Sequence, residues 1–318
     1  MERNLALELV RVTEAAALAS ARWMGKGDGA AADRAARDAV SVVMRSVKVA
    51  GRIVIGDVDV AAAPAPRKSS PRAAEIPEVD VAIDALQSIE SVAFGRPYAI
   101  STIAVSNRDA FLVPPVPYMN KIAVGPEATG RVNIKASALD NLVNIADAKR
   151  CYVEDLTVCI LDRERHRALI DEVRAAGARI QLISDGDLTA MLATAVPGSG
   201  VDVVMGIGGS AEGVLAAAAL KCVGGDLQAL FHPRDEGEEE ALRAAGYARK
   251  DRVLRADDFV RGENSMFAAT GITTSDVLQG VQFVPGGAVT HSIVMRSKSG
   301  TVRQITAHHR FDRKPVYK

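Results

Sequence analysis

The chain has 318 residues, 48% hydrophobic and 4% aromatic, which suffices for one large α/β domain or two smaller ones with full cores. Its 39 basic and 39 acidic residues give a formal net charge of zero, so no overall field favours nucleic acid or an anionic membrane, and we expect neither as a partner. Three widely spaced cysteines fit neither a disulfide framework nor a CxxC metal site, and no secretory or membrane-spanning segment is visible, so we expect a reducing, cytoplasmic location.

In the first part of the chain, two helical patterns precede a series of short strands. Apolar residues at helical spacing and a glycine-rich stop predict the first helix, and a stretch with four prolines predicts a loop. The predicted elements, in chain order, are helix 2–24, a helix that carries Asp33 and runs to about Met44, strand 52–55, loop 60–77, strand 79–83, a hairpin of 99–105 with 110–113, and strand 122–124.

From residue 157 onward, strand and helix patterns alternate regularly. The predicted elements are strand 157–161, helix 165–176, strand 179–183, helix 187–195, strand 202–205 and helix 211–221. This order predicts a βαβαβα unit with a parallel sheet, and therefore an α/β fold. The boundary between two halves falls within residues 126–156, where Ser137 can cap a connecting helix. We place it between an N-terminal half, 1–135, and a C-terminal half, 136–318.

Acidic side chains follow the early strands. Asp57 and Asp59 come directly after one short apolar strand, and Asp84 follows the next. Carboxylates at strand ends are how an α/β protein gathers oxygen ligands for Mg²⁺ or Mn²⁺, so the pattern points to metal-assisted phosphate chemistry. The plainer alternative is a turn after a strand, but two carboxylates on one face are like charges that favour a cation.

A glycine-rich turn, residues 206–213, follows a buried strand and opens a helix, so its backbone N–H groups can bind an anion or a metal phosphate. It lacks the third glycine of a dinucleotide fingerprint and the spacing of a nucleophile elbow. The alternative is a tight turn that only packs a helix on a sheet. The helix dipole would favour Glu212 in the first turn even without a metal.

Further polar groups follow the other predicted parallel strands. Asp185-Gly186-Asp187 fits a ligand contact or a turn with a helix cap, and Arg163 and Arg165 fit phosphate contacts or a solvated helix start. The ligand interpretation gains because α/β sheets bind ligands at the carboxyl ends of parallel strands. The five histidines have no HxH or HExxH spacing, so we expect neither zinc nor histidine-based catalysis, and surface or packing roles instead.

These residues carry a resemblance. Over nearly its whole length the chain resembles the class II fructose-1,6-bisphosphatases, some of which also act on sedoheptulose 1,7-bisphosphate, in the lithium-sensitive phosphatase superfamily. The matching stretches are Leu9–Ala16, Val54–Gly56, Tyr118–Lys121, Asp185–Asp187, Gly206–Gly209, Ala269–Thr273, Thr290–Ser292 and Arg296–Thr301. The resemblance implies a layered α/β/α/β sandwich and hydrolysis of a sugar 1-phosphate by a metal-bound water.

Carried over by position, the resemblance also implies site residues. The family's GEGE stretch reads Gly56-Asp57-Val58-Asp59, and its DPIEGT motif reads Asp84-Ala85-Leu86-Gln87-Ser88-Ile89, so a Glu has become Gln87 and the water-orienting Thr has become Ile89. A family lysine is Gly29. The implied catalytic residues are Asp33, Asp57, Asp84 and Gln87; the implied ligands of Mg²⁺ or Mn²⁺ are Asp57, Asp59, Asp84 and Glu212.

All the implied substrate contacts except Tyr118 lie in the second half. They are Tyr118, Arg163 in place of a Lys, Arg165, Asp185, Gly186 and Asp187. They would hold a sugar mono- or bisphosphate, and the family resemblance suggests a homo-oligomer. A family Arg is Leu230 here. Ser88 could supply a hydroxyl one residue before Ile89, but the motif aligns without a gap, which argues against that replacement.

Two hypotheses of different class follow. In the first, the chain is a divalent-metal-dependent sugar-phosphate phosphatase with a remodelled site, whose substrate need not be fructose 1,6-bisphosphate. In the second, hydrolysis is lost and the chain binds phosphosugars or has been recruited to another phosphosugar transformation. Ile89 lacks the hydroxyl of the family threonine that it replaces. This loss favours the second hypothesis, because water positioning and proton handling contribute several powers of ten in rate. The four persistent acidic positions favour the first.

Overall fold

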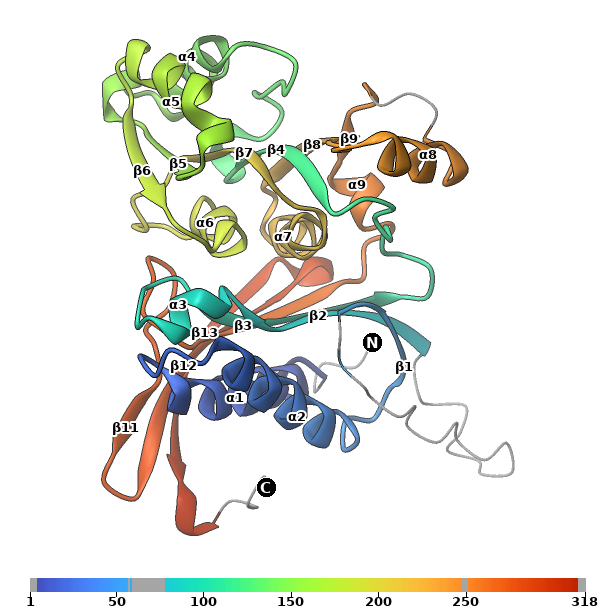
Figure 1. Ribbon diagram of the computed structural model, residues 1–318, viewed down its shortest axis with the longest axis vertical. Coiled ribbons are helices and arrows are strands. Elements are labelled where there is room, and N and C mark those ends of the chain that lie inside the picture. The colour runs from blue at the N-terminus through green and yellow to red at the C-terminus, as the bar shows by residue number, and fades with distance from the viewer. Residues whose placement is uncertain (1–4, 57, 59–77, 248–250, 314–318) are drawn as a thin grey trace. The chain divides into compact units, whose positions relative to one another are not determined.

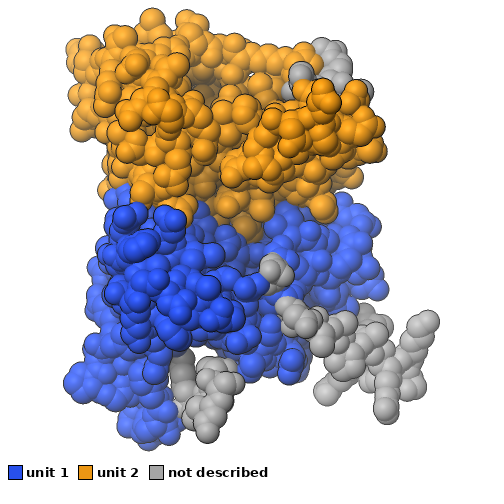
Figure 2. Space-filling model, in the orientation of Figure 1, with its two compact units in different colours: residues 1–111, 262–318 blue, residues 112–261 orange. Residues whose placement is uncertain are grey.

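The computed structural model describes residues 5–56, 58, 78–247 and 251–313 (Figure 1). Two compact units divide the chain, one made of residues 1–111 with 262–318 and the other of residues 112–261 (Figure 2). The chain therefore leaves the first unit at residue 112 and returns to it at residue 262. The functional division into halves at residue 135 remains a prediction.

The first unit is a seven-stranded sheet with helices α1 and α2 packed on one face (Figure 1). Strands β1 and β2 are parallel, and the other pairings are antiparallel. The strand order is β1-β2-β3-β10-β12-β11, with β13 also paired to β12. The elements are α1 (Leu5–Ser20), α2 (Gly29–Met44), β1 (Ala50–Ile55), β2 (Glu78–Gln87), α3 (Ile89–Ala93), β3 (Ile100–Asn107), β10 (Met266–Gly271), β11 (Gln282–Val284), β12 (Gly287–Arg296) and β13 (Thr301–Arg310).

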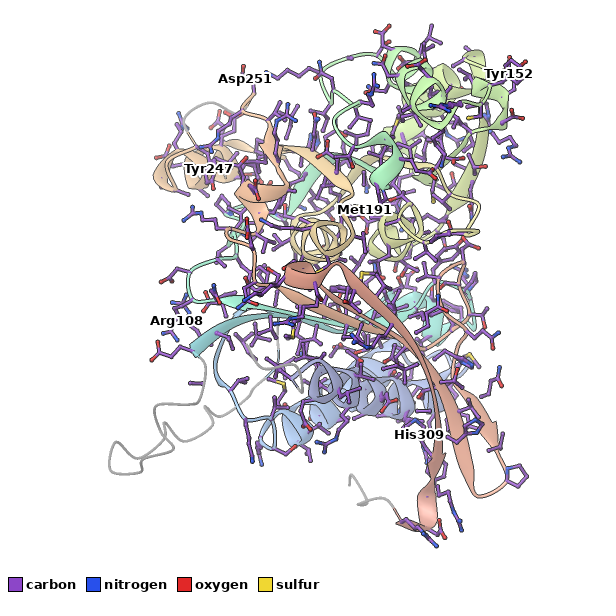
Figure 3. All side chains as sticks on the ribbon, turned by 180° about the vertical axis from the view of Figure 1, so that it is seen from behind. Arg108, Tyr152, Met191, Tyr247, Asp251 and His309 are labelled. Carbon is purple, nitrogen blue, oxygen red and sulfur yellow. The ribbon has the colours of Figure 1, made fainter. Side chains whose placement is uncertain are left out.

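A buried polar chain ties the N-terminal helix to the C-terminal strands. Thr290 of β12 donates its hydroxyl proton to Glu14 of α1, with 3.2 Å between the oxygens. That hydroxyl must then accept from His309 Nε2 of β13, 2.7 Å away (Figure 3), because it has only one proton to give. Strand pairing places β12 and β13 in the first unit, and these contacts link them to α1 and satisfy its buried glutamate.

The second unit is a six-stranded sheet in the order β6-β5-β7-β4-β8-β9, with α4 and α5 on one face and α6 and α7 on the other (Figure 1). The elements are β4 (Tyr118–Val124), α4 (Ala138–Lys149), β5 (Thr157–Leu161), α5 (Arg167–Ala175), β6 (Arg179–Ile183), α6 (Asp187–Ala193), β7 (Val203–Gly209), α7 (Ser210–Val223), β8 (Asp226–Phe231), α8 (Glu236–Ala244), β9 (Leu254–Arg255) and α9 (Ala256–Phe259). Met191 of α6 is fully buried in this unit, whereas Tyr152 is 78% exposed (Figure 3).

The expected α/β class and the βαβαβα unit are confirmed. Strand β5 pairs in parallel with both β6 and β7, and each strand is followed by its predicted helix. The side chain of Ser137 accepts a hydrogen bond from the N–H of Asp140 and caps α4 as predicted. Each unit is thus a layered α/β structure. Among the described residues, no helix combines the length and apolarity needed to cross a bilayer.

Two strand predictions were wrong. Residues 99–113 do not form a hairpin, because β3 pairs with β2 and with β10 instead of with residues 110–113. With β2 on one side and β10 on the other, β3 forms backbone hydrogen bonds along both of its edges, whereas a hairpin with the four residues 110–113 would pair only one edge. The strand predicted over residues 79–83 continues to Gln87, so Asp84 lies within β2 and not beyond its end.

Candidate functional site

A β-bulge in β2 brings the two candidate residues of the first unit to the same face. Residues 79, 81, 83 and 85 of β2 contribute to the core with α1 and α2, so Asp84 points to the opposite face. The register with β3 shifts by one residue between Asp84 and Gln87, and Leu86 joins Ala85 in the core. Gln87 therefore returns to the face of Asp84, although residues three apart lie on opposite faces of a regular strand.

The carboxyl ends of β1 and β2 lie at one edge of the sheet, because these strands are parallel. Gly56, directly after β1, has φ of +118°, and a Cβ added there would lie 2.3 Å from the carbonyl oxygen of Ile83. Only glycine fits this close approach. The ends of the two strands therefore lie side by side, whereas Asp57 and Asp59 themselves lie outside the described residues.

Helix α2 carries Asp33, whose carboxylate pairs with Arg37 at 2.6 Å. One turn earlier, Gly29 packs against Ile89 of α3, and a Cβ added to Gly29 would lie 2.6 Å from Ile89 Cγ2. Positions 29 and 89 are two of the departures from the family pattern. They are in contact, so Ile89 occupies the space that a side chain at position 29 would need.

Ser88 links β2 to α3 in a left-handed conformation, with φ 68° and ψ 57°. This region disfavours residues with a Cβ and favours glycine, which is the family residue in this motif. The Ser88 hydroxyl is buried and has no hydrogen-bond partner within residues 5–56, 58, 78–247 and 251–313. Ser88 is thus a strained and unsatisfied position directly between Gln87 and Ile89.

In the second unit, the turn from β7 into α7 gathers three charged side chains. Lys121 of β4 is almost fully buried, and its Nζ lies 2.7 Å from Asp187 Oδ2 and donates to Gly209 O at 2.7 Å. A Cβ added to Gly208 would lie 2.1 Å from Asp187 Oδ2, and one added to Gly209 would lie 1.9 Å from Glu212 Oε2. The glycines of this turn therefore make room for the carboxylates.

Partial burial raises the pKa of the Glu212 carboxyl, and the charge of Asp187 raises it further, while Lys121 opposes both. One ammonium thus faces two carboxylates at the start of α7. A divalent cation beside Glu212 would reverse this effect and keep the carboxylate ionised, and carboxylate oxygens are the donors that Mg²⁺ and Mn²⁺ prefer. The metal-ligand role that the resemblance implies for Glu212 remains a prediction.

The predicted phosphosugar contacts Tyr118 and Arg165 lie beside the same turn. The guanidinium of Arg165 is centred 5.7 Å from the Tyr118 ring and donates to Ile207 O at 2.9 Å. A second guanidinium, from Arg234, lies 5.0 Å from the same ring. The two guanidinium groups around this tyrosine form a guanidinium patch whose N–H donors suit a phosphate, and that of Arg234 is paired with Glu238.

The remaining predicted contacts are less closely grouped. Asp185 accepts a hydrogen bond from the N–H of Gly186, at 2.8 Å, and Gly186 caps α6 with φ of +91°. This is the turn-and-cap arrangement that the sequence left open as an alternative. Arg163 is exposed and donates to the carbonyl of Asp162. Asp187, the first residue of α6, forms the ion pair with Lys121 described above.

Sequence reasoning missed Lys121, Arg234 and His166. Lys121 had a usable signal, since it is a lysine inside an otherwise apolar strand and must be paired when buried. His166 fits the packing role that was one of the two expected for the histidines, since it is 2% exposed, but no sequence pattern indicated that its two ring nitrogens contact β5 and β7. No sequence pattern pointed to Arg234.

The predicted metal set is not tested as a whole. Within the described part of the chain, no three His, Cys, Asp or Glu side chains gather closely enough to hold a metal ion. Two of the four predicted ligands, Asp57 and Asp59, lie outside that part, while Asp84 and Glu212 belong to different units. Their convergence remains a prediction.

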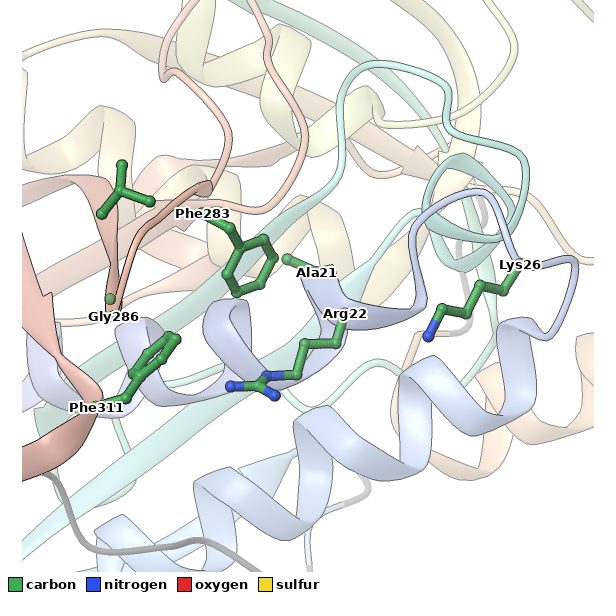
Figure 4. A pocket seen from close by; sticks show the side chains of 8 residues that line it. Ala21, Arg22, Lys26, Phe283, Gly286 and Phe311 are labelled. Atoms are coloured by element: carbon green, nitrogen blue, oxygen red, sulfur yellow. The ribbon is translucent and has the colours of Figure 1, made fainter.

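A hollow of about 630 Å³ lies elsewhere, in the first unit (Figure 4). Its lining includes Phe283 and Phe311, and the Arg22 guanidinium is centred 5.8 and 5.1 Å from their rings. Lys26 lies at its edge. None of the predicted site residues lines this hollow, so it carries no part of the assignment.

Comparisons with known proteins agree with the sequence resemblance. Residues 3–309 match the family described as bacterial fructose-1,6-bisphosphatase, glpX-encoded. A protein from Thermosynechococcus vestitus named D-fructose 1,6-bisphosphatase class 2/sedoheptulose 1,7-bisphosphatase is 38% identical over 340 residues, which cover 98% of this chain and 97% of the relative. Proteins of the same name from Microcystis aeruginosa and Synechococcus elongatus are each 37% identical, over 100% and 98% of this chain and 99% and 98% of their own.

Proposed function

Because the chain belongs to the glpX-encoded, class II fructose-1,6-bisphosphatase family of phosphoric monoester hydrolases, we propose that it hydrolyses a phosphate monoester of a sugar bisphosphate and requires a divalent metal. One observation carries the proposal: the turn of residues 206–212 binds the Arg165 guanidinium, suited to a phosphate, through Ile207 O and packs the Glu212 carboxylate, suited to a metal, against Gly209. Both parts of a metal-assisted phosphatase site thus meet on one loop.

The proposed metal ligands are Asp57, Asp59, Asp84 and Glu212, with Mg²⁺ or Mn²⁺ as the ion. Such an ion supplies an activated water and neutralises charge on the phosphate. Gln87 lies on the face of Asp84 and can offer its amide oxygen, but it adds no negative charge. We therefore propose weaker metal binding than in a relative with glutamate at this position.

The proposed substrate contacts are Tyr118, Arg163, Arg165, Asp185, Gly186 and Asp187, to which we add Arg234. Arg165 and Arg234 would bind phosphate oxygens, each as a planar donor that stays charged at all relevant pH values. Arg165 is held by Ile207 O, and Arg234 by Glu238, with Nε to Oε1 at 2.8 Å. Both guanidiniums are therefore oriented before a ligand arrives, which lowers the entropy that binding must overcome.

The departures at positions 29, 87 and 89 predict slow hydrolysis of fructose 1,6-bisphosphate itself. Ile89 can neither donate to nor accept from a water, and it also fills the space of a side chain at position 29. Asp33, on the same helical face as Gly29, would remain to handle a proton near the attacking water. The substrate that this site accepts best is proposed to differ from that of a relative with the full motif.

The second hypothesis, a phosphosugar-binding chain without hydrolysis, draws on the same contact. The packing of Ile89 on Gly29 is complementary, as expected when an apolar pair has replaced polar catalytic side chains. Under this hypothesis the guanidinium patch of the second unit keeps its ligand, while metal binding and turnover are absent.

Calorimetric titration with Mn²⁺ tests the metal proposal directly. We expect binding by the unmodified chain, at least tenfold weaker binding by Glu212→Gln, and unchanged binding by Glu240→Gln, an exposed glutamate on α8. Loss of a charged ligand removes more than the ~1.4 kcal/mol that corresponds to tenfold. Equal binding by Glu212→Gln and the unmodified chain would show that the ligand is misassigned.

A further inference from the structure

His166 lies buried between β5 and β7, where its two ring nitrogens bind two different strands. Nδ1 is 2.8 Å from Leu161 O at the end of β5, and the N–H of Ile207 points to Nε2 from 2.8 Å away in β7. Gly206, with φ of +125°, leaves room for the ring, because a Cβ there would lie 2.9 Å from Nε2. The glycine at position 206 therefore leaves the space that this imidazole occupies.

These contacts define the protonation state of the ring. A backbone N–H can only donate, so Nε2 must be the unprotonated acceptor, and Nδ1 must carry the proton that is donated to Leu161 O. A second proton on Nε2 would face the N–H of Ile207 with another donor and break that hydrogen bond. The arrangement is stable only with neutral imidazole.

The consequence reaches the proposed phosphosugar contacts through Ile207. The N–H of Ile207 donates a hydrogen bond to His166, and its carbonyl accepts one from Arg165. Arg165 directly precedes His166 in the chain, and its guanidinium lies over the ring of Tyr118. Two adjacent side chains thus hold the two sides of Ile207. Directly after it come Gly208 and Gly209, against which the carboxylates of Asp187 and Glu212 are packed.

We propose that His166 is a positioning residue for the phosphosugar subsite: as neutral imidazole it fixes Ile207, and through Ile207 the guanidinium of Arg165 and the turn into α7. This inference rests on the proposed function, because it takes Arg165 and Tyr118 as phosphate contacts. His166 does not touch the ligand. Its protonation releases Ile207, so binding of the phosphosugar weakens in acid.

The surroundings of the ring keep it neutral. Burial lowers the pKa of His166 below its usual 6.5, and the charges of Arg165 and Arg163 lower it further, against the hydrogen bond to Leu161 and the charge of Asp187 on α6. β7 contributes no charged side chain. Because the unfolded chain takes up this proton first, His166 makes folding less stable as the pH falls below about 6.5 towards the lower folded value.

Spectroscopy of chain with ¹⁵N-labelled histidine rings tests the protonation state without any activity. We expect the His166 signals of an unprotonated Nε2 and a protonated Nδ1, with titration below the ordinary histidine pKa of 6.5. The reverse tautomer, or titration at or above that ordinary value, would overturn the proposal.

Three variants test the positioning role. His166→Gln keeps an acceptor near Nε2 for the N–H of Ile207, His166→Phe keeps a ring without an acceptor, and His308→Gln is the control. For fructose 1,6-bisphosphate titrated without metal, we expect about tenfold weaker binding by His166→Phe, since a buried N–H loses its partner. We expect His166→Gln to bind within about threefold of the unmodified chain, and its binding to weaken less in acid than that of the unmodified chain, because only the titration of the ligand remains.

In the hydrolysis assay the same variants should change KM far more than kcat. Equal effects of Gln and Phe, or an unchanged KM in His166→Phe while the unmodified chain is active, would overturn this inference alone. Failure of the proposed hydrolysis has a different signature, since the unmodified chain would then release no phosphate from the bisphosphate. If the unmodified chain also failed to bind the bisphosphate, both proposals would fall.

Discussion

Ser88 is the most strained residue of the candidate site and gives the simplest stability test. It has φ of 68° and a buried hydroxyl that has no partner among residues 5–56, 58, 78–247 and 251–313. Ser88→Gly should raise the free energy of unfolding by about 1 kcal/mol, because a left-handed conformation disfavours a Cβ by roughly that amount. Urea unfolding measures the change.

Ser88→Ala is the control for this prediction. It removes the hydroxyl but keeps the Cβ in the left-handed conformation, so its gain should be smaller than that of glycine. If alanine stabilises the chain as much as glycine, the unsatisfied hydroxyl is the cause and the backbone strain is not.

Lys121 and Asp187 form a buried ion pair whose two members depend on each other. Lys121→Met should lower the free energy of unfolding by about 3–5 kcal/mol, because it leaves a buried carboxylate unpaired. Much of that loss should return in Lys121→Met with Asp187→Leu, which removes both charges. The exposed Lys298→Met should stay within about 0.5 kcal/mol of the unmodified chain. A small loss in Lys121→Met would mean that another cation neutralises Asp187.

At the scale of elements, the contact between α2 and α3 couples two replaced motif positions. Gly29→Ala should destabilise the chain by about 1–3 kcal/mol, because the added Cβ meets Ile89 Cγ2 at 2.6 Å. In an Ile89→Ala background the same change should be neutral or stabilising, since alanine has the better helix propensity. Urea unfolding of the four chains closes a double-mutant cycle. Additive effects would contradict the steric coupling.

This coupling bears on any attempt to restore the family motif. A lysine at position 29 needs space that Ile89 occupies, so single reversions at 29 or 89 should gain little. The Gln87→Glu change lies on β2 and should act through metal affinity. Residues that act as one unit are non-additive, so the combined reversion should exceed the product of the single effects.

How far the elements could be predicted depended on how local their contacts are. The βαβαβα unit was predictable because the hydrophobic periodicity within each strand and helix is enough to identify it. The parallel arrangement of the strands then follows from the alternation of strands and helices. The partners of β3 were not, because β10 lies over 150 residues further along the chain. The bulge at Ala85 and Leu86 could not be predicted from the sequence pattern of β2 either, because it depends on the register between β2 and β3.

At the scale of the whole molecule, the motifs that carry the family resemblance lie on both units. The acidic motif of residues 84–89 belongs to the first unit, while the residues 185–187 and 206–212 belong to the second. Sequence motifs singled out candidate site residues, and four of them, Tyr118, Arg165, Asp187 and Glu212, lie around one turn of the second unit. The sequence motifs could not predict that Lys121 and His166 hold this turn in place. These two side chains become buried and find their partners only when β4, β5 and β7 come together.

The central claim is that this chain is a metal-dependent phosphatase of sugar bisphosphates with a remodelled site. Phosphate release from a panel of sugar mono- and bisphosphates, with Mg²⁺ or Mn²⁺ and with chelator, tests it most directly. We predict metal-dependent release from at least one sugar bisphosphate, lost in Glu212→Gln, and release from fructose 1,6-bisphosphate that is slow and rises in Gln87→Glu with Ile89→Thr. No release from any member of the panel, with phosphosugar binding retained, would contradict the claim and favour the non-hydrolytic hypothesis.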